Sequence, residues 1–529
     1  MTSTSKADPP GLSLPATALL DRLRSQILLS PVPHDSIEVR APYTNSPIGH
    51  IPNGTPADLD FALARARAAQ LGWSRLSFPD RAAIFLRFHD LLLNRQHEAL
   101  DLIQWETGKA RRHAFEEVLD TAVVCRYYAR HAERLLRPRR RKGAFPLLTL
   151  TREFRSPVGV VGFIVPWNYP LNLAVTDAVP ALLAGNAAIV LPDVQTSFTA
   201  LWALDLLRQA GLPPDLFAVV TGHGPTLGPA LGERVDFLMF TGSTRTGRLV
   251  ARQAGERLIP CSLELGGKNP MLVLADADLE AAVYGAIQGC FVGAGQVCVS
   301  TERIYVDESI AGRFLDRLVE RTRALRLGAS LDFSIDMGSL TSVRQLRRVE
   351  AHVADALARG AVAVAGGRPR PDLGPLFYEP TVLIHVTPGM QVFAEETFGP
   401  VVSVYPFASE SEAVACANAG PYGLNASIWT RDTARAVRLA REIHAGNVGI
   451  NEPYAATWGS VDAPCGGWKE SGLSARHGRE GILKFTRAQN VAIERLIPIG
   501  TPSWLPAEVH ARWMTRLLKF LRFIRVFDW

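Results

Sequence analysis

Short apolar runs alternate with longer amphipathic stretches along the middle of this 529-residue chain. Apolar positions at helical spacing predict helices over residues 56–71 and 79–135, the second group broken near 106–109, and another helix over 196–210. The intervening apolar runs predict strands at Val158–Val165, Ala187–Leu191, Leu216–Thr221 and Phe237–Thr241. Strands that alternate with helices are typical of a parallel α/β sheet.

A second block with the same alternation follows Glu264. Its predicted strands are Met271–Leu274, Arg303–Val306, Val362–Ala365 and Val401–Pro406, whereas the residues before about 55 form a polar, proline-containing segment. A chain of this length is expected to divide into two or three domains. The pattern therefore predicts one α/β domain followed by another.

The composition of the chain mainly serves to exclude classes of protein. The chain is 47% hydrophobic and 20% charged, as is ordinary for a globular protein. No apolar run reaches the roughly 18 residues that span a bilayer, and no secretory signal is apparent, so we expect a cytoplasmic protein. Basic runs occur at 137–142 and 512–525 without any nucleic-acid-binding motif, so no nucleic-acid partner is expected.

Six cysteines are scattered through the chain, with no CxxC pair and no Cys/His spacing suited to zinc. We therefore expect free thiols and no metal site. A lone cysteine is most often a small buried hydrophobic residue, and five of the six are interpreted in that way. Cys298 differs because of the residues around it.

Cys298, Glu264 and Asn168 together supply a thiol nucleophile, a carboxylate base and an amide donor. These groups can attack a carbonyl, hold the resulting oxyanion and activate water. They lie in the segments Gly295-Gln296-Val297-Cys298, Leu263-Glu264-Leu265-Gly266-Gly267-Lys268 and Pro166-Trp167-Asn168-Tyr169-Pro170. Structural alternatives remain open for each: Asn168 could shape a turn, Glu264 could pair with an arginine, and Lys268 could be a solvated loop charge.

A phosphate-binding turn is predicted in the first block. The strand ending at Thr241 runs into Gly242 and Ser243, which open a helical pattern. Backbone N–H groups at a helix start suit a pyrophosphate, although this is not the GxGxxG fingerprint and a plain turn with an N-cap is the alternative.

Six motifs in order give the chain a resemblance to the NAD(P)-dependent aldehyde dehydrogenase superfamily. Besides the segments around Asn168, Glu264 and Cys298, they are Phe240-Thr241-Gly242-Ser243-Thr244, Glu395-Glu396-Thr397-Phe398-Gly399-Pro400 and Pro464-Cys465-Gly466-Gly467. The resemblance covers roughly residues 40–492 and is closest to the succinate-semialdehyde-dehydrogenase-like branch.

This resemblance implies an aldehyde dehydrogenase-like α/β fold with a Rossmann-type cofactor domain, an α/β catalytic domain and a small β element for oligomerisation. The implied division is an N-terminal extension at 1–35, a cofactor-binding domain at 36–142 and 157–264, a catalytic domain at 265–450, oligomerisation strands at 143–156 and 484–494, and a C-terminal extension at 495–529. A homodimer or homotetramer is expected.

The resemblance also assigns roles. It implies that Cys298 attacks the aldehyde, that Asn168 and the Cys298 backbone N–H hold the oxyanion, and that Glu264 activates water against the thioester. An ordinary thiol pKa, near 8.5, would need only modest help from surrounding dipoles. Lys268 would orient the site, and the cofactor would be held by Val165, Pro166, Trp167, Asp193, Gly242, Ser243, Leu265, Glu396 and Phe398.

Two departures from the family pattern bear on specificity. Leu191 and Val194 stand where a lysine and a glutamate are usual, and Asp193 would repel a 2′-phosphate, so NAD is expected over NADP unless Arg245 and Arg248 compensate. Positions where succinate-semialdehyde enzymes carry substrate-binding arginines read Thr176-Asp177 and Phe291-Val292-Gly293.

The expected reaction is oxidation of a small-molecule aldehyde to a carboxylic acid, with succinate semialdehyde as the first substrate hypothesis. The alternative is a membrane-associated dehydrogenase of long-chain or other hydrophobic aldehydes. A CoA-acylating enzyme of the family lacks the glutamate, so Glu264 argues against that class. Retention of Cys298, Asn168 and Glu264 argues against a non-catalytic relative.

Residues 512–527 form a predicted amphipathic helix beyond the family's usual end. Apolar residues gather on one side and basic residues on the other. The apolar set is Trp513, Met514, Leu517, Phe520, Leu521, Ile524 and Phe527, and the basic set is Arg512, Arg516, Lys519, Arg522 and Arg525. The helix is expected to dock on the body or on a neighbouring subunit, or to lie on anionic lipid and make the enzyme peripheral to a membrane.

Overall fold

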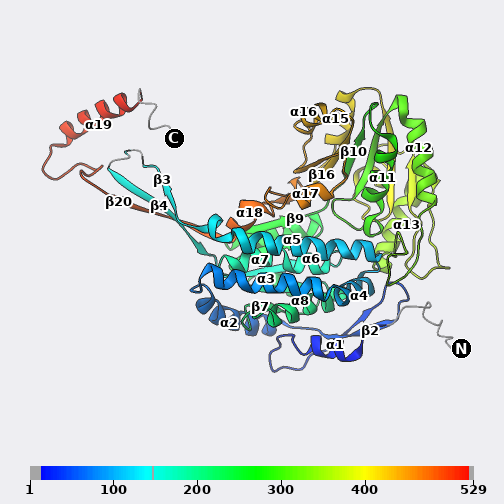
Figure 1. The fold of residues 1–529 in the computed structure, drawn as a ribbon, viewed down its shortest axis with the longest axis horizontal. Helices are drawn as coiled ribbons and strands as arrows, with labels where there is room; N and C mark the ends of the chain where they lie inside the picture. The colour runs from blue at the N-terminus through cyan, green and yellow to red at the C-terminus, as the bar shows by residue number, and fades with distance from the viewer. Residues whose placement is uncertain (1–13, 144, 146–147, 523–529) are drawn as a thin grey trace.

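The computed structural model describes residues 14–143, 145 and 148–522. A six-stranded sheet in the order β19-β9-β8-β5-β6-β7 carries the first α/β block (Figure 1). Its strands are β5 (Val160–Val165), β6 (Ala187–Pro192), β7 (Phe217–Val219), β8 (Phe237–Thr241), β9 (Cys261–Glu264) and β19 (Gly472–Leu473). All pairs are parallel except β19 with β9. Strands β5 to β8 confirm the predicted ones.

The second block forms a seven-stranded sheet in the order β12-β13-β14-β11-β10-β16-β17. Its strands are β10 (Asn269–Val273), β11 (Thr301–Asp307), β12 (Val362–Ala365), β13 (Thr381–Ile384), β14 (Val401–Phe407), β16 (Asn425–Trp429) and β17 (Asn447–Ile450). Only β12 is antiparallel to its neighbour. Two small pairings, β1 (Ser36–Arg40) with β2 (Pro47–Pro52) and β15 (Tyr422–Gly423) with β18 (Trp468–Lys469), complete the body.

Helices cover both sheets. In the first half they are α1 (Thr17–Arg24), α2 (Pro56–Trp73), α3 (Phe78–Asn94), α4 (Gln96–Thr107), α5 (Arg111–Leu136), α6 (Pro170–Val175), α7 (Ala178–Leu183), α8 (Ser197–Gln209), α9 (Gly224–Gly232) and α10 (Thr244–Glu256). In the second half they are α11 (Leu279–Phe291), α12 (Glu308–Arg323), α13 (Val343–Ala358), α14 (Gln391–Ala394), α15 (Glu410–Asn418), α16 (Thr433–Ala440), α17 (Ala455–Gly459), α18 (Gly478–Leu483) and α19 (Ala507–Leu521).

Local signals explain where the long helical region divides. Gly108 ends α4 with a φ of 77°, which glycine adopts without strain, and this is the predicted break near 106–109. A second break, at Arg95 between α3 and α4, was not predicted. The polar start of the chain also contains more structure than its pattern suggested, because Leu20 and Leu23 of α1 are buried in the main core.

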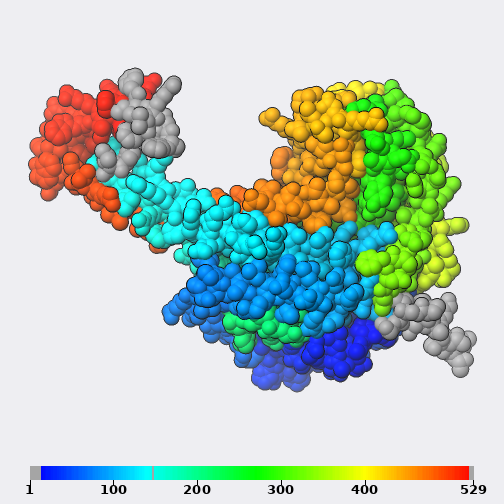
Figure 2. All heavy atoms as spheres, in the orientation of Figure 1, coloured from blue at the N-terminus to red at the C-terminus, as the bar shows by residue number. Residues whose placement is uncertain are grey.

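A three-stranded arm projects from the body. It consists of β3 (Arg139–Arg141), β4 (Thr149–Pro157) and β20 (Thr486–Glu494), with β4 in the middle. Figures 1 and 2 show the arm and α19 extending away from both large sheets. Helix α19 has no buried residue, so it is not docked on the described part of the body; Ile524, Arg525 and Phe527 lie outside the described residues. No helix within the described ranges is long and apolar enough to cross a membrane.

Candidate active site

Cys298 lies in a tight loop between α11 and β11. The residues Gly293, Ala294 and Gly295 all have positive φ, and a Cβ on Gly295 would lie 2.0 Å from the Gly399 carbonyl oxygen, so glycine is required there. Burial raises the pKa of the Cys298 thiol to about 12, with Arg476 acting in the opposite direction and Glu396 and Glu264 adding to the rise. The expectation of a nearly ordinary thiol is therefore corrected, because the buried thiol needs a base.

Glu264 ends β9 and is a candidate for that base, since its charge acts on the Cys298 thiol. Its side chain is buried, and its Oε1 atom has no hydrogen-bond partner among the described residues. Burial raises its pKa to about 7, against the opposing charges of Arg476 and Lys484. Within the described chain no cation lies within 4.0 Å of the carboxylate, so the alternative of an ordinary ion pair does not hold. A carboxyl poised near neutrality suits general-base work.

Asn168 lies between β5 and α6, facing the loop of the nucleophile. Its Nδ2 donates to the carbonyl of Gln296 at 3.0 Å, two residues before Cys298. From the other side, Lys109 Nζ donates to the Asn168 carbonyl at 2.6 Å and to Glu117 Oε1 at 2.7 Å. Glu117 in turn accepts from the backbone N–H of Leu171 at 2.9 Å. The Asn168 backbone is therefore fixed from below by a buried ion pair.

That supporting pair escaped the sequence argument. Lys109 follows the break glycine and Glu117 lies on α5, so each looked like an ordinary helix charge. The buried side of α5 also carries Arg111, His113 and Thr121, so no local pattern singles out Glu117 as the partner of Lys109.

Lys268 is buried and pairs with Glu302, so it is not a solvated loop charge. The Glu302 carboxylate also accepts from the backbone N–H groups of Thr397 and Phe398, at 2.9–3.0 Å. Lys268 thus orients the Glu396–Phe398 segment through Glu302. Glu302 is a further site residue that the sequence does not reveal, because β11 also carries Thr301, Arg303 and Asp307 and its burial becomes clear only in the fold.

The Glu396 segment lies against the nucleophile loop. Glu396 Oε1 accepts from the Gly267 N–H at 2.9 Å, and a Cβ on Gly267 would lie 2.7 Å from the Cys298 carbonyl oxygen. Trp167 meets Phe398 edge-to-face with ring centroids 5.6 Å apart. The structure therefore places the predicted residues Glu396, Phe398 and Trp167 near the loop of Cys298, with Gly267 between that loop and Glu396.

At the other end of the proposed cofactor site, Ser243 caps α10 by accepting from the Thr246 N–H. Gly242 precedes it, so the helix start is open to an anion, and Leu265 packs beneath it against Gly247. Val165 and Pro166 end the neighbouring strand region. Together with the Glu396 carboxylate, an acceptor for ribose hydroxyls, these residues fit a dinucleotide.

Asp193 and Leu191 are less accessible to a bound cofactor than the sequence suggests. The Asp193 carboxylate accepts from the Gln195 N–H at 3.0 Å and caps a 3-10 turn, η1 (Val194–Thr196), and burial raises its pKa. Leu191 is only 1% exposed.

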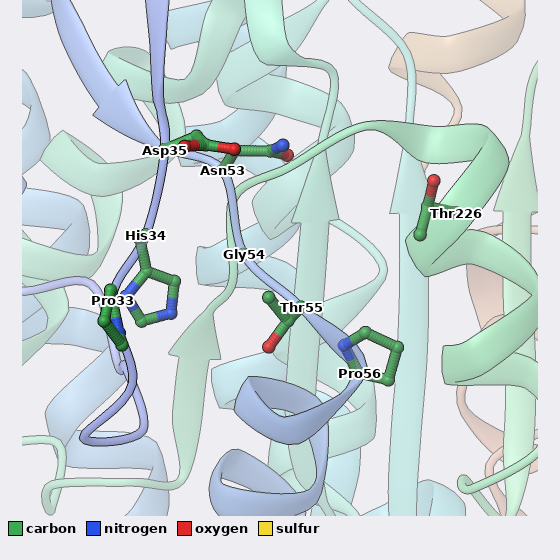
Figure 3. A pocket seen from close by; sticks show the side chains of 8 residues that line it. All are labelled: Pro33, His34, Asp35, Asn53, Gly54, Thr55, Pro56 and Thr226. Carbon is green, nitrogen blue, oxygen red and sulfur yellow. The ribbon is translucent and has the colours of Figure 1, made fainter.

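A cavity of about 300 Å³ lies elsewhere, at the starts of α2 and α9 (Figure 3). Pro33, His34, Asp35, Asn53, Gly54, Thr55, Pro56 and Thr226 line it, and none of them belongs to the set around Cys298.

The model of the aldehyde dehydrogenase family matches residues 31–491. The chain belongs to the aldehyde dehydrogenase family. A candidate succinate-semialdehyde dehydrogenase (NADP+) of Mycobacterium tuberculosis is 46% identical over 509 residues, covering 96% of this chain and 98% of that protein. The 4,4′-diapolycopene aldehyde oxidase of a Methylomonas species is 38% identical, covering 89% and 88%. The NAD+ complex of Staphylococcus aureus betaine aldehyde dehydrogenase matches with a TM-score of 0.85 at 31% identity, covering 90% and 96%.

As a member of the aldehyde dehydrogenase family, the protein is an NAD(P)-dependent oxidoreductase that acts on aldehydes. The predicted fold class is confirmed as well, with a Rossmann-like sheet and a separate catalytic sheet. The roles of individual residues rest on the geometry described above.

Proposed function

We propose that Cys298 is the nucleophile, Asn168 and the Cys298 backbone N–H hold the oxyanion, and Glu264 is the base. Glu264 takes the thiol proton as sulfur attacks the aldehyde carbon, and the two donors stabilise the thiohemiacetal oxygen. The cofactor would supply the hydride acceptor when bound. Glu264 releases the thiol proton to solvent and then takes a proton from water; hydroxide adds to the thioester, the C–S bond breaks, the acid leaves, and Glu264 returns that proton to the Cys298 thiolate.

One observation carries this proposal. A buried carboxylate with a pKa of about 7 and an oxygen without a partner in the described structure is costly unless it has a use. Its place at the end of β9, with Gly266 and Gly267 leading directly to the Cys298 loop, gives it that use.

For the substrate we propose succinate semialdehyde, supported by the near full-length similarity to the mycobacterial candidate enzyme. The test is NAD(P)H formation from succinate semialdehyde, butanal, hexanal, decanal and benzaldehyde at matched concentrations. A kcat/KM for succinate semialdehyde at least tenfold above that for butanal supports the proposal. A ratio below one overturns it.

A second substrate class is favoured by one specific feature. An apolar cluster beside the nucleophile contains Val292, Val297 and Tyr454, with Tyr169 and Trp458 packed against it. The hydroxyls of Tyr169 and Tyr454 donate to Glu116, whose pKa burial raises. Such a wall accepts a hydrocarbon chain, and the cation that lies against it, Lys109 at 3.8 Å from the Tyr169 ring centroid, is already paired with Glu117. A kcat/KM rising from butanal to decanal would identify this class, and the 38% identical relative acts on a carotenoid aldehyde by its name.

The arm supports the proposal that the enzyme works as a homodimer or homotetramer. Strand β20 is an edge strand that pairs only with β4 among the described residues, and all but its first residue are exposed, with Val491 and Ile493 among them. An open apolar edge of this length is a template for pairing with another chain. Light scattering should give a mass above 57.7 kDa for the wild type. The variant Val491→Arg/Ile493→Arg should lower it, whereas Val437→Arg, at an exposed site on α16, should not.

For α19 we propose contact with an anionic membrane surface. Trp513 and Phe520 are exposed on its apolar face, whereas Arg512, Lys519 and Arg522 lie on the other side, which also carries the exposed Leu518. For the cofactor we propose a preference for NAD, supported by Leu191 and Asp193, although the mycobacterial relatives carry NADP in their names.

A further inference from the structure

A buried cluster of three charges adjoins Glu264. Arg476 Nε lies 2.9 Å from Asp177 Oδ2, and Lys484 Nζ lies 3.1 Å from Asp177 Oδ1. The side chains of Arg476, Asp177 and Lys484 are 16%, 4% and 7% exposed. Two cations share one carboxylate, so the cluster carries one positive charge that Asp177 does not compensate.

Both cations are anchored on the strands that carry Glu264. Arg476 Nη2 donates to Thr241 Oγ1 at 2.5 Å, and Thr241 pairs directly with Glu264 across β8 and β9. Neighbouring strands lie about 4.8 Å apart, so the guanidinium is bonded to the side chain next to Glu264. Lys484 Nζ donates to Ser262 Oγ at 3.2 Å, and Ser262 lies two residues before Glu264 on the same face of β9.

Backbone hydrogen bonds to Cys465 also fix the position of Arg476. Its N–H donates to the Cys465 carbonyl at 2.7 Å, and the Cys465 N–H donates to the Arg476 carbonyl at 2.9 Å. Four residues before Arg476, Gly472 of β19 pairs with Glu264 itself. The guanidinium therefore has little freedom to leave the position that Asp177 and Thr241 define.

We propose that Arg476, held by Asp177, is a positioning residue that keeps Glu264 ionisable at neutral pH inside the buried site. A carboxylate is costly to bury without compensation, and an uncompensated cation a strand away lowers that cost. The role is electrostatic: Arg476 donates to Thr241 rather than to Glu264, which leaves the carboxylate free for water. This inference rests on the proposed role of Glu264 as the base.

Other titratable groups face the same cluster. Asp120 accepts from Asn172 Nδ2 at 2.5 Å, and burial raises its pKa to about 7. Burial lowers the pKa of His477 to about 4, so this imidazole is neutral during turnover, and the thiols of Cys298 and Cys465 are neutral for the same reason. Asp120, beside the cluster, and Glu396, beside the nucleophile, are thus the other described groups of the site whose pKa burial raises to about 7.

Loss of the Arg476 guanidinium should change the pH dependence of kcat in a defined direction. Removing the guanidinium removes a charge that favours ionised Glu264, so the pKa of Glu264 rises and less of it is ionised at pH 7. The acid limb of the kcat profile should then move to higher pH by about one unit or more. Turnover recovers in alkaline solution, which a purely structural defect would not produce.

The experiment compares Arg476→Gln, Arg476→Lys and Arg257→Gln with the wild type between pH 5.5 and 9, using the better of succinate semialdehyde and hexanal. Arg257 is the matched control, since its guanidinium donates only to the carbonyls of Gly232 and Val235 in the same domain. We expect the acid limb to move in Arg476→Gln, to return most of the way in Arg476→Lys and to stay in place in Arg257→Gln.

An unmoved acid limb in Arg476→Gln overturns the inference, as does an equal shift in Arg257→Gln. If Arg476→Gln does not fold, the decision falls to Asp177→Asn, which keeps the size of the side chain and removes the anion that offsets Arg476; the acid limb should then move to lower pH, and an unmoved limb overturns the inference. The Glu264→Gln variant separates this test from the proposed function: if it turns over normally, the base assignment fails. If it is blocked while Arg476→Gln keeps its acid limb, only the role of Arg476 fails.

Discussion

The surroundings of Cys298 differ from the projecting arm and α19 in whether side chains find partners within the chain. Around Cys298, buried charges find partners within the chain: Lys109 with Glu117, Lys268 with Glu302, and Arg476 with Asp177. On strand β20 of the arm and on helix α19, apolar side chains lie in solvent: Ile493 is 52% exposed and Trp513 is 59% exposed. One region is complete within a single chain, whereas the other is arranged to be completed by something outside it.

This difference separates chemistry from assembly. The nucleophile, the base and the amide donor each lie at the end of a strand or in a loop that a buried ion pair fixes, so their geometry does not depend on a partner. The arm contributes none of these residues. Damage to the first region should therefore abolish turnover, and damage to the second should change association.

The largest expected effect is on Cys298. Cys298→Ala and Cys298→Ser should lower aldehyde-dependent NAD(P)H formation by at least about 10⁴-fold, because no covalent intermediate forms. Thermal melting and cofactor binding should stay close to the wild type. Cys416→Ala, a cysteine outside the site, is the control and should retain full activity. Substantial activity in Cys298→Ala would remove the central assignment.

Glu264→Gln should reduce steady-state turnover by about 10²–10³-fold. Because Glu264 serves both as the base for the thiol and as the base for water, the first round of NAD(P)H formation should slow along with thioester hydrolysis, so rapid mixing should show a slow first turnover without a burst. In the wild type, the pKa of about 7 for Glu264 predicts that kcat falls as pH drops below neutrality, because the protonated acid cannot take a proton from water. Unchanged steady-state turnover in Glu264→Gln would make Glu264 structural.

The sequence predicted the parts of this site that have a local signature. Strands β5 to β8 and the motifs around Cys298, Glu264 and Asn168 are continuous stretches, so periodicity and spacing reveal them. The supporting pairs are not continuous: Asp177 and Arg476 are 299 positions apart in the sequence and meet because β19 joins the six-stranded sheet beside β9. Asp177 lies where succinate-semialdehyde enzymes carry a substrate-binding arginine. The sequence shows that difference, but it does not show that Asp177 pairs with Arg476.

Helix α19 should affect membrane binding rather than the rate of aldehyde oxidation. The full chain should co-sediment with vesicles of anionic lipid, and a chain ending at Leu505 should not, because each basic residue near such a surface contributes about 1 kcal/mol. The matched variant Trp513→Ser/Phe520→Ser keeps the charges and removes two exposed apolar anchors. Its binding should fall several-fold while activity on a soluble aldehyde stays the same. Equal soluble fractions for all three proteins would assign α19 to contact between subunits instead.

The smallest expected effect concerns the cofactor. Wild-type kcat/KM with NAD should exceed that with NADP, since Leu191 offers no charge to a 2′-phosphate and Asp193 repels it. Asp193→Asn keeps an oxygen to accept from the Gln195 N–H, so η1 keeps its cap while the charge is lost. The NAD/NADP ratio should fall by about fivefold, or about 1 kcal/mol, as for one partly screened charge. Arg245→Gln should move the ratio the other way, because Arg245 is an exposed cation at the start of α10. A wild type that prefers NADP, with Arg245→Gln abolishing that preference, would show that the helix start governs selection and that Asp193 serves only as a cap.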